Sequence, residues 1–95
     1  MVMKEQVIEV LKTCFDPELM TDVWTLELIY NIKIEKEKIM IDMTYTTPMC
    51  PYGQTMVEDI KQKVKALKGV KTVIVNVVFD PPWKPSDALR EMFGL

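Results

Sequence analysis

One short segment holds the residue types best suited to chemistry, since residues 46–51 read Thr-Thr-Pro-Met-Cys-Pro. Proline suits the first position of a helix, so Pro51 predicts a helix start with Cys50 as its N-cap. Unpaired amides and the positive end of the helix dipole would then stabilise a Cys50 thiolate without any histidine. Thr46 and Thr47 could place hydroxyl groups beside that sulfur. Cys50 could instead be a small buried residue filling the corner between strand and helix. The flanking prolines favour a functional thiol, because they fix the backbone that presents it.

Asp16 and Glu18 are the second candidates, because two carboxylates on either side of Pro17 could bind a metal or polarise a thiol. The same residues also suit a simple turn in which Asp16 accepts backbone N–H groups, and residue types alone favour this interpretation. The other thiol, Cys14, is expected in the core near the end of the first helix. A disulfide between Cys14 and Cys50 is not favoured in the cytosol.

The composition excludes several kinds of site. The 95 residues include 0 histidines and 2 cysteines. A Ser-His-Asp triad, a Cys-His pair, an imidazole metal site and a four-cysteine cluster within one chain are therefore excluded. A net charge of −2 argues against nucleic acid as a partner. No segment approaches the roughly 20 apolar residues of a membrane span, and the N-terminal residues lack the apolar run of a signal peptide. We expect one cytoplasmic domain over residues 1–95, with no membrane partner.

Helices are predicted where apolar residues recur at three- and four-residue spacing. This pattern covers residues 3–14 and resumes after Pro51, ending at Gly69. A last short helix is expected over residues 87–93, with Ser86 as its cap.

Strands are predicted where apolar and polar residues alternate. The alternation covers residues 26–34 and 39–46, and the short polar connection between them makes an antiparallel hairpin. The first strand is expected to place one set of residues on a single face: Leu26, Leu28, Tyr30, Ile32 and Ile34. Residues 70–79 are apolar on both faces, which is typical of an interior strand. The predicted fold is α+β, a two-layer helix-strand-strand-helix-strand domain with a short C-terminal helix, in which helices cover one face of a small mixed sheet.

The C-terminal tail contains Trp83 between prolines and offers apolar surface. It could fold back over the sheet as a lid. It could equally serve as a docking edge for another protein, with Trp83 as the contact residue.

Several motifs resemble, in their order and spacing, those of the PaaD/SufT-like family of small proteins associated with iron-sulfur cluster assembly. They are Asp16-Pro17-Glu18-Leu19, Leu28-Ile29-Tyr30, Thr46-Thr47-Pro48-Met49-Cys50-Pro51, Gly69-Val70 and Phe79-Asp80-Pro81-Pro82-Trp83. The resemblance covers essentially the whole chain and implies a fold related to the C-terminal domains of cluster scaffold proteins. It also implies that Cys50 is the reactive cysteine, with paired threonines at Thr46 and Thr47 and an acidic pair at Asp16 and Glu18.

One stretch departs from that family. Many members carry Asp-Leu-Gly-Leu at the entry to the first strand, where this chain has Thr25-Leu26-Glu27-Leu28. Any metal or partner contact made by that aspartate would be absent at Thr25. Glu27 in place of glycine argues against a strained backbone at this position.

The resemblance implies an accessory role in assembling iron-sulfur clusters or transferring them to client apoproteins. Clusters usually take four protein ligands, so one active thiolate needs a homodimer, a partner protein or small thiols to complete the coordination. We therefore expect iron or an iron-sulfur cluster to be held transiently at Cys50 and shared between chains, with none stably bound to the monomer. The expected partners are client apoproteins and other cluster assembly proteins.

Two other functional classes stay open. The protein could be an adaptor that acts through Trp83 and the tail. It could also be a thiol-dependent enzyme with Cys50 as nucleophile and a carboxylate as base, although a non-catalytic role is favoured in a chain without histidine.

Overall fold

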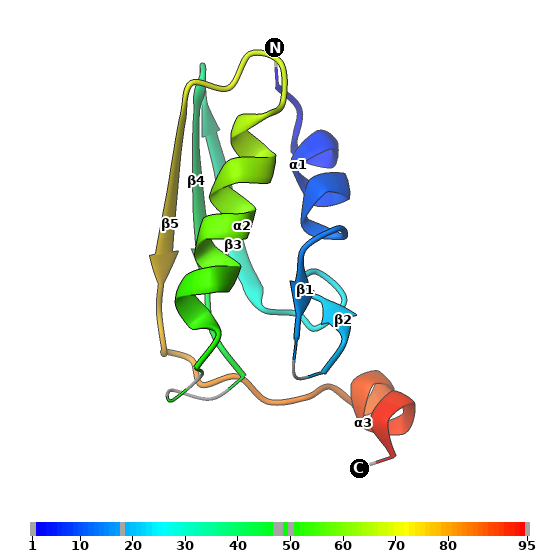
Figure 1. Ribbon diagram of the computed structural model, residues 1–95. Coiled ribbons are helices and arrows are strands. Elements are labelled where there is room, and N and C mark those ends of the chain that lie inside the picture. Colours follow the sequence, from blue (N-terminus) through cyan, green and yellow to red (C-terminus); the bar gives the residue numbers. More distant parts are fainter. Residues whose placement is uncertain (1, 18, 47–48, 50, 95) are drawn as a thin grey trace.

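The structure, a computed structural model, describes residues 2–17, 19–46, 49 and 51–94, and its elements follow the predicted order (Figure 1). A helix, a hairpin, a second helix, a strand and a last helix are all present, which confirms the predicted α+β class. One small hairpin was not predicted and lies between the first helix and the sheet. In chain order the elements are α1 (Lys4–Leu11), β1 (Phe15–Asp16), β2 (Thr21–Asp22), β3 (Ile29–Glu35), β4 (Lys38–Met43), α2 (Gly53–Lys65), β5 (Thr72–Val77) and α3 (Asp87–Phe93).

The main sheet has three strands in the order β3-β4-β5, with β3 antiparallel and β5 parallel to β4. A parallel pair needs a crossover connection, and α2 supplies it by running across one face of the sheet. The predicted hairpin and mixed sheet are thus confirmed. The prediction that residues 70–79 form an interior strand is wrong, because β5 lies at an edge. Val73 and Val75 are half-buried and pack against the core, and Ile74 of the opposite face is also half-buried.

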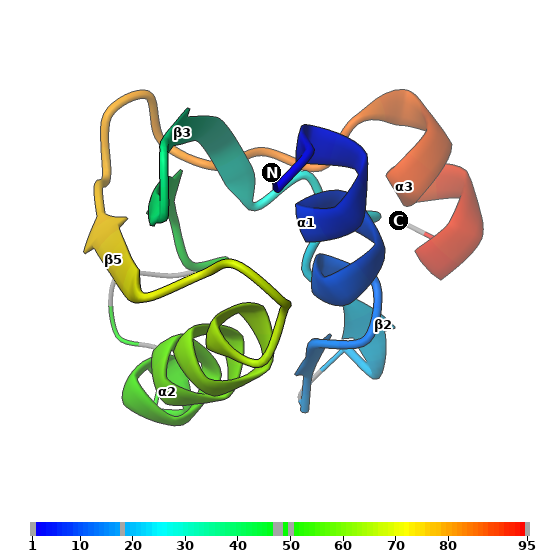
Figure 2. The ribbon, with the colours of Figure 1, turned by 90° about the horizontal axis from the view of Figure 1, so that it is seen from above.

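The core lies between the sheet and the two longer helices. Viewed from above, α1 and α2 lie side by side on the same side of the sheet (Figure 2). Alternate residues of β4 point into this layer, as the period of a strand requires. The fully buried members of the core include Val7, Leu11, Leu26, Leu28, Ile39, Ile41, Met43, Ile60 and Val64.

The first long strand differs from the prediction in its start and in its phase. It begins at Ile29 rather than at residue 26, and an irregularity between Ile29 and Asn31 adds a residue to the ladder. Such a bulge reverses the alternation. Tyr30 therefore does not share a face with Ile32 and Ile34, which pair with the inward residues of β4 and pack on the core.

The tail after β5 crosses beneath the sheet and ends in α3 beside the small hairpin (Figure 1). The predicted helix over residues 87–93 is confirmed, including its cap, because the N–H of Leu89 donates to Ser86 Oγ at 3.3 Å. Gly94 ends the helix with φ of 72°, a left-handed conformation that suits glycine. Leu89 is only 2% exposed, so the tail contributes to the core.

Candidate functional site

The second helix begins later than its sequence predicted. α2 starts at Gly53 and its N-cap is Tyr52, so the prediction that Cys50 is the N-cap is wrong. A tertiary contact requires glycine at this first position. The ring of Tyr45 occupies the space that a Cβ at position 53 would fill. Cys50 itself lies outside the described residues, as do Thr47 and Glu18.

Asp16 lies in β1 and is fully buried, with 0% of its surface exposed. Its Oδ1 accepts the N–H of Leu19 at 3.4 Å, and its carbonyl accepts the N–H of Met20 at 2.8 Å. The carboxylate thus caps the turn that follows, as one of the two interpretations predicts. A turn cap is normally exposed, and complete burial of a carboxylate costs free energy unless polar groups surround it. The role of Asp16 in a functional site stays a prediction.

The first thiol is part of the core. Cys14 is 1% exposed, and its Sγ donates to the carbonyl of Val10 at 3.5 Å. Burial, followed by the negative charge of Asp59, raises the pKa of Cys14 to about 11. A thiol with such a pKa is protonated at neutral pH and unsuited to bind metal or to attack a substrate. The prediction that Cys14 is a core residue is confirmed, and any thiol chemistry of this chain falls to Cys50.

The segment after β4 places Thr46, one of the two predicted threonines, at one end of the molecule. Thr46 is half-buried there, and the small β1-β2 hairpin with Asp16 lies toward the same end, in the lower half of Figure 1. Two apolar residues on either side of position 50 are exposed at this end, Met49 at 87% and Tyr52 at 44%. Exposed apolar residues around a polar centre are suited to contact with another protein.

Trp83 connects the tail to the body of the protein. It is half-buried, and its indole N–H donates to the carbonyl of Leu26 at 2.7 Å. The hydroxyl of Tyr30 similarly donates to the carbonyl of Pro81 at 2.7 Å. Both bonds hold the tail across the end of the sheet. The structure thus shows an intramolecular role for Trp83, and its role in partner docking stays a prediction.

The stretch that departs from the family pattern has a strained backbone after all. Glu27 adopts φ of 60°, in the left-handed region that favours glycine, so the expectation of an unstrained backbone is wrong. The conformation is imposed by the tight turn around it. Asp22 holds this turn by accepting the N–H of Thr25 on its carboxylate at 2.8 Å and the N–H of Leu26 on its carbonyl at 3.1 Å.

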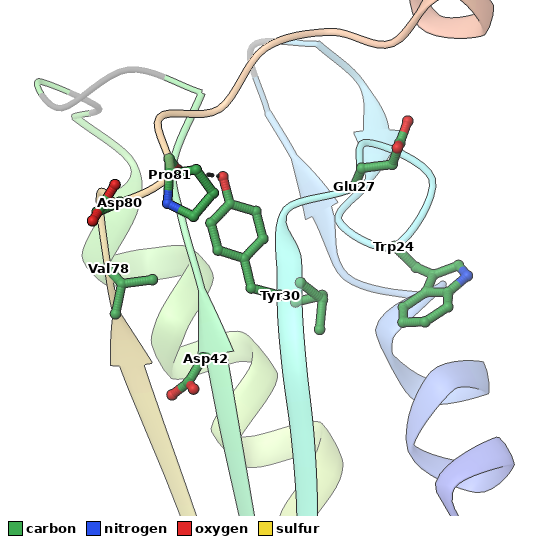
Figure 3. Close-up of a pocket in the computed structure, with 8 residues that line it drawn as sticks. Trp24, Glu27, Tyr30, Asp42, Val78, Asp80 and Pro81 are labelled. Carbon is green, nitrogen blue, oxygen red and sulfur yellow. Dashed lines mark hydrogen bonds between the residues drawn. The ribbon is translucent and has the colours of Figure 1, made fainter.

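A hollow of about 770 Å³ was not anticipated from the sequence (Figure 3). It lies where the tail leaves the sheet, and none of the predicted site residues lines it. Its walls include two aromatic residues and three carboxylates: Trp24, Tyr30, Glu27, Asp42 and Asp80. Tyr30, Glu27 and Asp80 lie in stretches that the sequence analysis singled out, but no pattern in the sequence indicated that they line one hollow. Within the described part of the chain, no three His, Cys, Asp or Glu side chains form a group that could hold a metal ion.

Comparison with known proteins identifies the family. Residues 4–77 match the family of iron-sulfur cluster assembly proteins. The chain belongs to this family. The match includes every predicted site residue except Trp83, and it confirms the resemblance found in the sequence motifs.

Curated relatives and a solved structure agree with this assignment. The chain is 37% identical to an Fe-S protein maturation auxiliary factor of Porphyromonas gingivalis, over 84% of this chain and 77% of that protein. It is 33% identical to the Fe-S protein maturation auxiliary factor SufT of Staphylococcus aureus, over 72% of this chain and 78% of the relative. A conserved hypothetical protein from Thermotoga maritima superposes with a TM-score of 0.87 at 43% identity, covering 99% of this chain and 96% of that one.

Proposed function

We propose that this family member is a non-catalytic accessory factor that assists iron-sulfur cluster assembly or transfer to client apoproteins in the cytoplasm, with Cys50 as the thiol that touches the cargo. The observation that carries the proposal is the division of the two thiols. Cys14 is buried, hydrogen-bonded and resistant to ionisation. Cys50 is the remaining thiol. It belongs to a Pro-Met-Cys-Pro segment and lies in the sequence between exposed Met49 and exposed Tyr52.

The ligand count explains why the cargo would be transient. A cluster usually takes four protein ligands, and this chain supplies one suitable thiol. The remaining ligands would come from a client, an assembly protein or small thiols. Incomplete coordination by one protein suits a transfer factor, because a client with more thiolates can remove the cluster. Asp16 and Thr46, with Glu18 and Thr47, would shape the polar surroundings of the sulfur.

Anaerobic reconstitution with iron and sulfide tests this proposal. Wild type and a Cys14→Ala variant should develop the absorbance of sulfur-to-iron charge transfer, while Cys50→Ser should lose most of it. Native mass spectrometry of the same samples shows which species carries iron and sulfide. Equal behaviour of Cys50→Ser and wild type would remove Cys50 from the mechanism.

A second variant tests the buried carboxylate. Asp16→Asn keeps the shape of the side chain and the acceptor for the Leu19 N–H, and it removes the negative charge. If Asp16 tunes the cargo site, reconstitution should decline while the far-ultraviolet circular dichroism stays that of wild type. Reconstitution at the wild-type level would show that Asp16 serves only as a turn cap.

A further inference from the structure

In the described part of the chain, β5 forms an open edge of the main sheet. The sheet ends at β5, and no element of the described residues lies beyond it (Figures 1 and 2). Its sequence, Thr-Val-Ile-Val-Asn-Val, contains no charge and no proline, and its register with β4 shows no irregularity. Natural proteins normally protect an edge with lysines, prolines or bulges, because unpaired backbone groups bind other strands.

The opposite edge of the same sheet has that protection. β3 carries the irregularity between Ile29 and Asn31, and it exposes Lys33 and Glu35, whose side chains form an ion pair at 3.0 Å. The two edges therefore differ in the features that prevent strand pairing. This difference points to β5 as the edge that binds another strand.

The ladder between β4 and β5 shows which backbone groups are directed outward. The N–H of Thr72 donates to Glu37 and the N–H of Val78 donates to Met43. In a parallel ladder every second residue makes both of its bonds to one neighbour. The even-numbered residues of β5 therefore pair with β4. The N–H and C=O groups of Val73, Val75 and Val77 point to the free edge.

We propose that β5 pairs antiparallel with β5 of a second copy of this chain, with Val75 opposite the partner's Val75. This register places Val73 opposite the partner's Val77, so every outward N–H and C=O of the three valines obtains a partner. The two-fold axis stands perpendicular to the sheet, which keeps the helices of both copies on one face. The two three-stranded sheets become one continuous two-layer structure.

The charges at the ends of β5 favour a second copy over an unrelated strand. Lys71 precedes the strand, forms an ion pair with Glu37 at 3.1 Å and is still 79% exposed at its side chain; Asp80 follows the strand and is also exposed. Antiparallel self-pairing brings the Lys71 end of each copy to the Asp80 end of the other. A client strand would have to carry this complementary pattern, whereas a second copy has it by symmetry.

The pairing has a consequence for the proposed cluster function, although it does not depend on it. Each copy has its own segment with Met49 and Tyr52, and in the dimer these two segments would lie at opposite ends of the combined sheet. Each copy would thus present its own site, and a cluster held at one site would be shared with a client rather than with the second copy in this dimer.

Amide exchange measured by nuclear magnetic resonance at several protein concentrations tests the register directly. The amides of Thr72, Ile74 and Asn76 should be protected at every concentration, since they bond to β4. The amides of Val73, Val75 and Val77 should gain protection only as the protein is concentrated. Sedimentation should show the mass rising from 11.1 kDa toward twice that value over the same range. Fast exchange of the three valine amides at all concentrations would overturn the proposal.

Variants separate this edge from other routes to a dimer. Val75→Pro removes an outward N–H and leaves the ladder to β4 intact, so it should be monomeric throughout. Asp80→Lys should weaken self-association up to about 30-fold, because it places like charges at both of the Lys71 contacts of the symmetric dimer, and Lys71→Glu/Asp80→Lys should restore it.

Circular dichroism verifies that these variants fold. If Val75→Pro does not fold, amide exchange in the wild-type protein decides whether β5 pairs with a second copy. Self-association should survive Cys50→Ser, which separates this proposal from the cluster function. Protection of the valine amides by a client apoprotein alone, with no self-association, would assign the edge to clients and refute the proposed dimer.

Discussion

Alkylation should distinguish the two thiols of the native protein sharply, because the fold protects Cys14 in two ways. Raising its pKa from 9.0 to about 11 lowers the thiolate fraction at pH 8. A pKa of about 11 instead of 9.0 leaves about 100-fold less thiolate, and thiolate is the reactive form. Burial adds to this effect, because the residue is 1% exposed and its Sγ is hydrogen-bonded to a helical carbonyl.

The assay is a time course with iodoacetamide at pH 8, followed by mass spectrometry of the peptides that contain Cys14 and Cys50. The same reaction in denaturant supplies the intrinsic rate of each thiol. We expect native Cys14 to react at least about 100-fold more slowly than denatured Cys14. A Cys14→Ala variant serves as the control, because all of its labelling must come from Cys50.

A native rate for Cys14 within tenfold of its denatured rate would refute this reasoning. It would mean that the helix end near Cys14 opens readily or that the thiol ionises in the fold. The assignment of thiol chemistry to Cys50 alone would then lose its basis.

Four further predictions concern the stability of the fold. The pKa of Cys14 is raised from 9.0 to about 11 in the folded protein. The stability gained from burying the neutral thiol is therefore fully present below pH 9.0 and is lost as the pH rises toward 11. In urea unfolding experiments, the free energy of unfolding should fall by about 2 kcal/mol more between pH 8 and 11 in wild type than in Cys14→Ala. The same dependence of this free energy on pH in both proteins would contradict the prediction. Gly53→Ala should lower stability by about 1–3 kcal/mol through overlap with the Tyr45 ring, despite a better helix former; an unchanged thermal midpoint would show that the ring moves freely. Trp83→Phe keeps an aromatic ring and loses the indole donor, which should cost about 1–2 kcal/mol in chemical denaturation, and no loss would mean that the bond does not hold the tail. Glu27→Gly should raise the free energy of unfolding by about 0.5–1 kcal/mol, because glycine adopts the left-handed backbone without steric strain. A lower free energy of unfolding in this variant would show that Glu27 is not strained.

The predictions from local sequence succeeded where neighbouring residues decide the structure. The last helix was predicted with its cap, because Ser86 and Gly94 act within one turn of their own positions. The hairpin of β3 and β4 and the buried alternation of Ile39, Ile41 and Met43 followed equally from period and turn length. The core position of Cys14 followed from its place at the end of an amphipathic helix.

The errors share a different cause. The need for glycine at the start of α2 depends on the Tyr45 ring, which lies between β4 and α2 along the chain. The strain at Glu27 depends on a turn closed by Asp22, and no property of a glutamate predicts a left-handed backbone. Tyr30 left its expected face because one bulge reversed the alternation.

The sequence by itself determined the class of fold, the family and the residues on which chemistry could depend. It did so because periodicity, proline positions and short motifs are local properties of the chain. Only the tertiary structure decided that the pKa of Cys14 is raised, that Asp16 is fully buried and that β5 lies at an open edge. Burial, pKa and edge position are properties of the surroundings, and those surroundings are supplied by residues far away along the chain.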